Sequence, residues 1–152
     1  MQEMSRLDAM AQAELVRRGE VSARELVDAA IARIEKTNPA VNAVVTTAFE
    51  RARADAAALE KEARNGRRPF LGVPFLMKDI GGQEAGAPYH MGMKCLKRAG
   101  WVEPESSHFT ERLRGFLGKA AQATLLGDVF DDAATGQGLL NVFLRGIACG
   151  AV

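Results

Sequence analysis

The sequence predicts an α/β fold, in which helices surround the first strands of a mixed sheet. Helical patterns occupy much of residues 7–64, and they are interrupted by one short run rich in Val and Thr at 42–47. A second short run, 70–77, is almost continuously apolar, as expected for a buried strand. The length of 152 residues fits one domain and is enough to bury a core.

The first two predicted helices have recognisable ends. Residues 7–18 form the first, and Gly19 ends it. The pattern Ser22-x-x-Glu25 is a capping box that opens the second, and Asn38-Pro39 is expected to end it. Apolar residues of the second helix share one face: Leu26, Val27, Ala30, Ile31 and Ile34.

A strand and an alanine-rich helix are predicted next. Residues 42–47 are expected to form the strand. Residues 49–64 are strongly helical, and Asn65-Gly66 stops them. One face of this helix carries the apolar side chains Phe49, Ala52, Ala56, Leu59 and Ala63.

The apolar run 70–77 is predicted to be a buried strand of a parallel or mixed sheet. Pro74 has no backbone donor, so it must lie at the start of the strand, on an edge or at a bulge. Lys78 and Asp79 then emerge at the carboxyl end of the strand, where open α/β sheets place ligand crevices. A glycine-rich loop at 81–88 follows.

Two further helices are predicted after that loop. The first is short and covers residues 91–98, and the second covers residues 107–116. Ser106 and Ser107 precede the second helix and are interpreted as its caps.

Lys78 has two interpretations. In the first, it pairs with Asp79 or another carboxylate and is simply solvated, as ion pairs at strand ends often are. In the second, it is a general base. A lysine ordinarily has a pKa of about 10.4, whereas a base works best near 7 to 8, so burial beside the apolar run would have to lower it.

Four segments, in order, resemble the amidase signature family. Gly72-Val73-Pro74, an apolar triplet and Lys78-Asp79 resemble the lysine strand of that family. Residues 22–26 and 34–43 resemble its N-terminal helix and first strand, and residues 107–114 resemble the helix after the lysine. Within the family, Gly92-Met93-Lys94 with Gly100-Trp101 is most similar to bacterial enzymes that open cyclic amide oligomers.

The resemblance implies hydrolysis of a small-molecule amide by a Ser-Ser-Lys triad, with no cofactor. In that family, the lysine takes a proton from a bridging serine, which activates a nucleophilic serine, while backbone N–H groups bind the oxyanion. Lys78 matches the base. The sequence does not identify residues that bind the substrate.

The two serines of the triad are not matched in this sequence. Its four serines are Ser5, Ser22, Ser106 and Ser107, and none lies in a glycine-rich run like that of the family. The resemblance covers residues 7 to about 119. Residues 1–119 are therefore assigned to the N-terminal part of an amidase domain, and 120–152 is interpreted as a divergent tail, arising for example from a frameshift. Residues 115–152 hold only five of the 39 charged residues but seven of the fifteen glycines.

We therefore expect a chain that is truncated before both serines, has an incomplete core and is inactive alone. Two alternatives remain open at this point. One is a non-catalytic interaction module that associates with itself or a partner through its exposed core. The other is a pseudogene product without a stable fold.

Composition gives further expectations about partners and location. The net charge of +1 predicts no nucleic-acid or anionic-membrane partner. The polar N-terminus and the two cysteines favour a cytoplasmic protein. His90 and His108 lack ligand-like spacing to Cys95 and Cys149, so no metal site is predicted.

Overall fold

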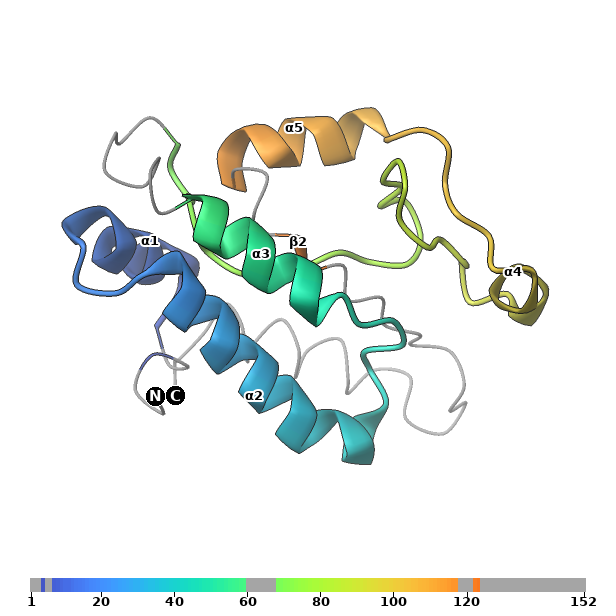
Figure 1. Cartoon of the computed structure of the whole chain (residues 1–152), viewed down its shortest axis with the longest axis horizontal. Coiled ribbons are helices and arrows are strands. Elements are labelled where there is room, and N and C mark those ends of the chain that lie inside the picture. The colour runs from blue at the N-terminus through green and yellow to red at the C-terminus, as the bar shows by residue number, and fades with distance from the viewer. Residues whose placement is uncertain (1–3, 5–6, 60–67, 118–121, 124–152) are drawn as a thin grey trace.

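A computed structural model describes residue 4 and residues 7–59, 68–117 and 122–123 of the chain. Within these residues there are five α-helices and two short strands (Figure 1). Their order is α1 (Ala9–Arg18), α2 (Ala23–Val41), α3 (Phe49–Leu59), β1 (Phe75–Leu76), α4 (Lys94–Ala99), α5 (His108–Leu117) and β2 (Gln122–Ala123). The helical content of the prediction is confirmed, whereas the described sheet is a single parallel pair.

Helix α1 begins and ends close to the predicted residues. The Asp8 carboxylate accepts a hydrogen bond from the Ala11 N–H at 2.8 Å and so caps the first turn. Gly19 ends the helix with a φ of 70°, a left-handed conformation in which glycine has no steric penalty.

Helix α2 has the predicted capping box but is longer than predicted. The Glu25 N–H donates to Ser22 Oγ at 3.1 Å, and the Ser22 N–H donates to Glu25 Oε2 at 2.8 Å. The prediction that Asn38-Pro39 ends the helix is wrong, since Pro39 lies inside it and the helix continues to Val41. Proline has a helical φ, and near the end of the helix it removes one backbone hydrogen bond, the one that residue 39 would donate to residue 35.

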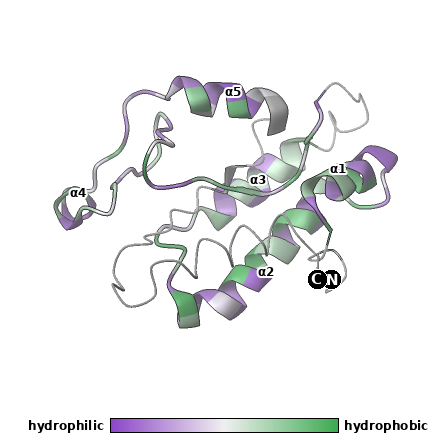
Figure 2. Ribbon diagram, turned by 180° about the vertical axis from the view of Figure 1, so that it is seen from behind, coloured by the Kyte–Doolittle hydropathy of each residue, from purple (hydrophilic) through white to green (hydrophobic). Residues whose placement is uncertain are grey.

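The core lies mainly between α2 and α3, which run side by side (Figure 1). Figure 2 shows apolar residues distributed along both helices. The predicted apolar faces are confirmed at seven positions that are buried: Leu26, Val27, Ile31, Ile34, Ala52, Ala56 and Leu59. Phe49 and Leu76 pack against this core from α3 and β1. Ala30 is only partly buried, and Ala63 lies outside the described residues.

The segment 42–47 is not a strand, so this prediction is wrong. It contains one bridge residue, Thr46, and is otherwise an irregular connection. Asn38 organises it, since its side-chain amide donates to the Val44 carbonyl at 2.9 Å and accepts from the Val44 N–H at 2.8 Å. One paired residue is too short to make a strand, since strand formation depends on context as well as on propensity.

The predicted strand over 70–77 is confined to Phe75–Leu76. Residues before it turn, because Gly72 has a φ of 82° and the Val73 N–H donates to the Phe70 carbonyl at 3.2 Å. Pro74 directly precedes β1, as predicted for a residue without a donor. Strand β1 pairs in parallel with β2, Phe75 with Gln122 and Leu76 with Ala123, so β2 lies within the segment 120–152.

The next helix, α4, is short and exposed. Helix α4 begins at Lys94, later than predicted, because Met91 and Gly92 have positive φ values of 52° and 69° that exclude a helix there. It has no buried residue and stands apart from α1, α2 and α3 (Figure 1).

Helix α5 agrees more closely with the prediction. Ser107 caps it, since the Thr110 N–H donates to Ser107 Oγ at 3.2 Å. Ser106 does not cap it and instead accepts from the Ala85 N–H at 3.0 Å.

Candidate functional site

Lys78 follows β1 after one intervening residue, as the sequence predicts, but its side chain is exposed. The residues on either side, Met77 and Asp79, are only 3% and 2% exposed. Extended chain alternates its side chains between two faces, so a lysine between two buried residues points away from the core. The burial that the second interpretation of Lys78 requires is therefore not provided by the residues that the structure describes.

Asp79 does not neutralise Lys78, although the two are adjacent. Its carboxylate turns inward, where Oδ1 accepts a hydrogen bond from the His90 N–H at 3.2 Å and Oδ2 accepts one from the Gly92 N–H at 2.6 Å. Lys78 makes no ion pair with any residue that the structure describes, so the interpretation of Lys78 as a simple partner of Asp79 is not supported.

Gly82 fixes the chain close to Lys78 from the other side of the turn. A Cβ atom at this position would overlap the Met77 side chain and lie 2.7 Å from the Lys78 carbonyl oxygen. The preceding residue is anchored too, because the Gly81 N–H donates to the hydroxyl of the buried Tyr89 at 3.1 Å. Only glycine at 82 leaves room for this close approach.

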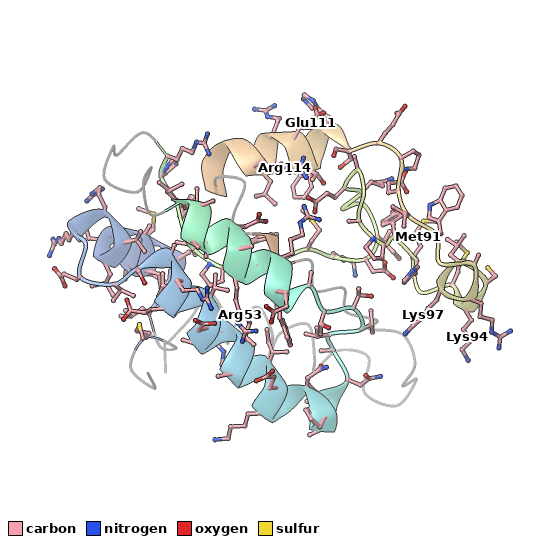
Figure 3. The ribbon with its side chains drawn as sticks, in the orientation of Figure 1. Arg53, Met91, Lys94, Lys97, Glu111 and Arg114 are labelled. Atoms are coloured by element: carbon pink, nitrogen blue, oxygen red, sulfur yellow. The ribbon has the colours of Figure 1, made fainter. Side chains whose placement is uncertain are left out.

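A second buried carboxylate joins the same loop to two helices. The Glu84 side chain, 2% exposed, accepts hydrogen bonds from Arg51 of α3 and Arg114 of α5. Arg114 lies on the side of α5 that faces α3 (Figure 3). Burial of Asp55 raises its pKa, and the nearby Glu84 carboxylate adds to this, while Arg51 and Arg114 act in the opposite direction.

An open pocket lies next to the turn that Asp79 holds. It is lined by three residues of the 42–48 connection and by loop and α4 residues: Val45, Thr46, Thr47, Pro88, His90, Lys97, Gly100 and Trp101. Trp101 is 45% exposed, and its indole N–H donates to Glu103 at 3.4 Å. The lining of the pocket includes one tryptophan, two threonines and one lysine.

The serines of the described ranges are occupied by local structure. Ser22 is in its capping box, Ser106 binds the loop that carries Glu84, and Ser107 caps α5. Ser5 lies outside the described residues. The structure therefore does not bring a serine together with Lys78 in any contact among the residues it describes.

The part of the chain that the structure describes was also compared with the requirements of a metal site, a disulfide and a membrane-spanning helix. Its His, Cys, Asp and Glu side chains form no group of three or more able to hold a metal ion. Cys95 is exposed, and Cys149 lies outside the described residues. None of the described helices is both long and apolar enough to cross a bilayer.

Asp79 and Glu84 were not predicted as structural centres of this site. Asp79 directly follows an apolar run, and Glu84 is the only acidic or basic residue, His90 aside, between Asp79 and Lys94. Their partners, however, are backbone N–H groups and arginines that the sequence does not reveal.

Comparison with known proteins shows similarity to parts of several longer proteins. It is 41% identical over 122 residues to a 6-aminohexanoate-cyclic-dimer hydrolase of Pseudomonas sp. (strain NK87), which covers 80% of this chain and 22% of the relative. It is 33% identical over 144 residues to a glutamyl-tRNA(Gln) amidotransferase subunit of Streptomyces coelicolor, covering 93% of this chain and 27% of the relative. The chain thus spans about a quarter of the length of these relatives.

A family model adds a different match, to a domain of unknown function (DUF6986), over residues 91–152. This match and the longer of the two alignments both cross residue 119. The predicted division into residues 1–119 and a divergent tail, 120–152, stays a prediction.

The fold comparison agrees with the sequence relatives. The structure superposes with a TM-score of 0.63 on the solved structure of a 6-aminohexanoate cyclic dimer hydrolase complexed with substrate, to which it is 36% identical. That superposition covers 81% of this chain and 23% of the hydrolase. A bacterial aryl acylamidase of the amidase signature family gives a TM-score of 0.66 at 34% identity, covering 80% of this chain and 24% of the acylamidase. Over the residues that these relatives cover, the chain belongs to the amidase signature family.

Proposed function

We propose that this chain supplies the lysine segment of an enzyme that hydrolyses a small-molecule amide, with Lys78 as the general base. The observation that carries the proposal is the placement of Lys78. It leaves the end of a parallel strand, its side chain is exposed, and the neighbouring carboxylate of Asp79 is engaged elsewhere. A lysine in this position is available to another part of the enzyme.

The proposed chemistry follows the resemblance to the family. Neutral Lys78 would accept a proton from a bridging serine, and that serine would accept a proton from the serine that attacks the amide carbonyl. The proton then passes to the leaving amine, and water releases the acyl group. No cofactor takes part in these steps.

The base requires a drier environment than this chain gives it. Water stabilises the ammonium form of an exposed lysine, whereas a general base must be neutral for part of the time. We propose that polypeptide corresponding to the rest of the relatives covers the exposed face of Lys78. The same polypeptide would contribute both serines, since Ser22, Ser106 and Ser107 are engaged in caps or loop contacts.

It follows that the 152-residue chain by itself should not hydrolyse amides. Triad members act together, and a base without its nucleophile retains little of their effect. The substrate class we propose is a linear or cyclic amide, since the relatives include a hydrolase of 6-aminohexanoate cyclic dimer and an aryl acylamidase.

A chimera tests this proposal. Residues 1–119 of this chain replace the corresponding segment of the 6-aminohexanoate-cyclic-dimer hydrolase, and hydrolysis of the cyclic dimer is measured. We expect the chimera to be active, and Lys78→Met to lower kcat by roughly 100- to 10,000-fold. The matched control is Lys36→Met, which removes an exposed lysine of α2 and should leave kcat unchanged.

Two outcomes would contradict the proposal. The first is a folded chimera in which Lys78→Met is as active as the unmodified chimera. The second is a folded but inactive chimera, because its other parts come from an active enzyme. Amide hydrolysis by the 152-residue chain alone would separately overturn the expectation that it is inactive.

A further inference from the structure

We propose that Asp79 is a positioning residue, which holds the turn at 90–92 and thereby fixes the direction in which Lys78 leaves β1. The relevance of this arrangement to catalysis rests on the proposed function of Lys78. The arrangement itself rests on hydrogen bonds, burial and backbone conformation, which can be measured independently of any activity.

Two backbone N–H groups of the turn converge on the carboxylate of Asp79. Met91 and Gly92 are consecutive left-handed residues, with φ values of 52° and 69°. Here the N–H groups of His90 and Gly92 both donate to the carboxylate of Asp79.

The contact offsets two costs at once. A non-glycine residue such as Met91 is disfavoured at positive φ, and a carboxylate that is 2% exposed is disfavoured unless it is well hydrogen-bonded. The hydrogen bonds to Asp79 stabilise the turn that contains Met91, and the same hydrogen bonds stabilise the buried carboxylate. Asp79 and the turn should therefore form and break together.

The side chain of Lys78 is not anchored to any described residue. Its direction therefore depends on how the backbone on each side of it is held. On one side, Met77 is buried, and Gly82 packs closely against the Met77 side chain and the Lys78 carbonyl. On the other side, the first fixed atoms are those of the Asp79 carboxylate. When Asp79 loses its partners, the backbone after Lys78 is released and the ammonium group is no longer confined to one direction.

The test uses the full 152-residue chain and three variants: Asp79→Asn, Asp79→Glu and, as a matched control, the exposed Glu105→Gln. The first measurement is amide hydrogen exchange at His90 and Gly92 by NMR. Hydrogen bonds to a charged group are strong, so we expect exchange at both amides to accelerate by about tenfold or more in Asp79→Asn.

The second measurement distinguishes positioning of Lys78 from a purely structural role. The rate at which acetic anhydride labels the Lys78 amine is compared with the rate at Lys36 in the same molecule. We expect this ratio to change in Asp79→Asn and to remain at the wild-type value in Glu105→Gln. Asp79→Glu, which keeps the carboxylate on a longer side chain, should recover part of both effects.

Several results would overturn the inference. If exchange at His90 and Gly92 is unchanged in Asp79→Asn, the carboxylate does not hold the turn. If exchange accelerates but the labelling ratio of Lys78 stays constant, Asp79 does not position the lysine. If both the exchange rates and the labelling ratio of Asp79→Asn equal the wild-type values, Asp79 neither holds the turn nor positions Lys78.

A second background covers the case in which Asp79→Asn does not fold. Met91→Gly removes the strained conformation at 91, so the same comparison can be made in Met91→Gly and in Met91→Gly with Asp79→Asn. None of these readouts is amide hydrolysis. An inactive chimera would therefore contradict the proposed function and leave this inference standing. Unchanged exchange and labelling in Asp79→Asn would contradict this inference and leave the proposed function standing.

Discussion

Glu84 accepts a hydrogen bond from Arg114, a residue 30 positions later in the sequence, although the Glu84 side chain is only 2% exposed. Arg51 of α3 donates to the same carboxylate oxygen. One carboxylate in a glycine-rich loop thus joins α3, α5 and the turn that follows Lys78. Such a contact fixes how α5 lies relative to α3.

The first prediction concerns this contact. Glu84→Gln keeps the size of the side chain but leaves two guanidinium groups beside a neutral amide. We expect the free energy of unfolding to fall by roughly 1–3 kcal/mol. Urea denaturation followed by circular dichroism measures it. Glu50→Gln, whose side chain is 88% exposed, is the control and should change stability by less than about 0.5 kcal/mol. Equal stability of the two variants would show that Glu84 does not join the helices.

The second prediction concerns the pH dependence of the contact between α2 and α3. The Asp28 carboxylate accepts from Arg53 Nε at 2.8 Å and from Arg24 Nε at 2.8 Å. The hydrogen bond from Arg53 is the main cause of a lowered pKa of Asp28 in the folded chain. Its stabilising contribution is therefore complete above the unfolded pKa of about 3.9 and is lost as the pH falls toward the lower folded value.

We expect Asp28→Asn to be less stable than the wild type at pH 7 and equally stable near pH 2. Because the Asp28 side chain is 40% exposed, the difference at pH 7 should not exceed about 1 kcal/mol. Thermal unfolding at the two pH values measures it. A difference that is the same at both pH values would show that the charge of Asp28 is not responsible.

The third prediction concerns Asp55, whose effect on stability changes with pH in the opposite direction to that of Asp28. Burial raises the pKa of Asp55, so the folded chain holds the proton more tightly than the unfolded chain. Ionisation of Asp55 then costs stability as the pH rises from the unfolded pKa through the folded one. Asp55→Asn should gain stability relative to the wild type between pH 3 and pH 7. Denaturation midpoints at both pH values test this, and a loss on raising the pH would contradict the direction of the shift.

The sequence predicted the features that depend on neighbouring residues. The capping box of Ser22 and Glu25 and the glycine that ends α1 were predicted correctly, because their partners are at most a few residues away. The strand at 42–47 was predicted wrongly, because the length of a strand depends on how many of its residues pair with a distant segment. The sequence also left open whether Lys78 is solvated or buried, since that depends on what covers its face.

The two buried carboxylates show the same limit within the site. Asp79 binds N–H groups 11 and 13 residues later, and Glu84 binds arginines 33 residues earlier and 30 residues later. Neither pairing has a local pattern, so each appears only once the chain is folded. The family resemblance located Lys78 but gave no information about these contacts.

The last prediction concerns the close approach of Gly82 to the lysine segment. In Gly82→Ala, the new methyl group would overlap the Met77 side chain and press on the Lys78 carbonyl oxygen. Met77 is buried and cannot move freely, so we expect a loss of about 1–3 kcal/mol in the free energy of unfolding. Gly115→Ala is the matched control, since position 115 lies in α5 and a methyl group there has, among the described residues outside its own helix backbone and chain neighbours, no atom within 4 Å.

In a helix, alanine is favoured over glycine by roughly 0.5–1 kcal/mol, so Gly115→Ala should be at least as stable as the wild type. Urea denaturation of the two variants compares the same chemical change at two positions. If Gly82→Ala is also neutral, Met77 and Lys78 can move together without cost. The lysine would then not be held in one place by its own segment, and its direction in an active enzyme would have to come from the polypeptide that covers it.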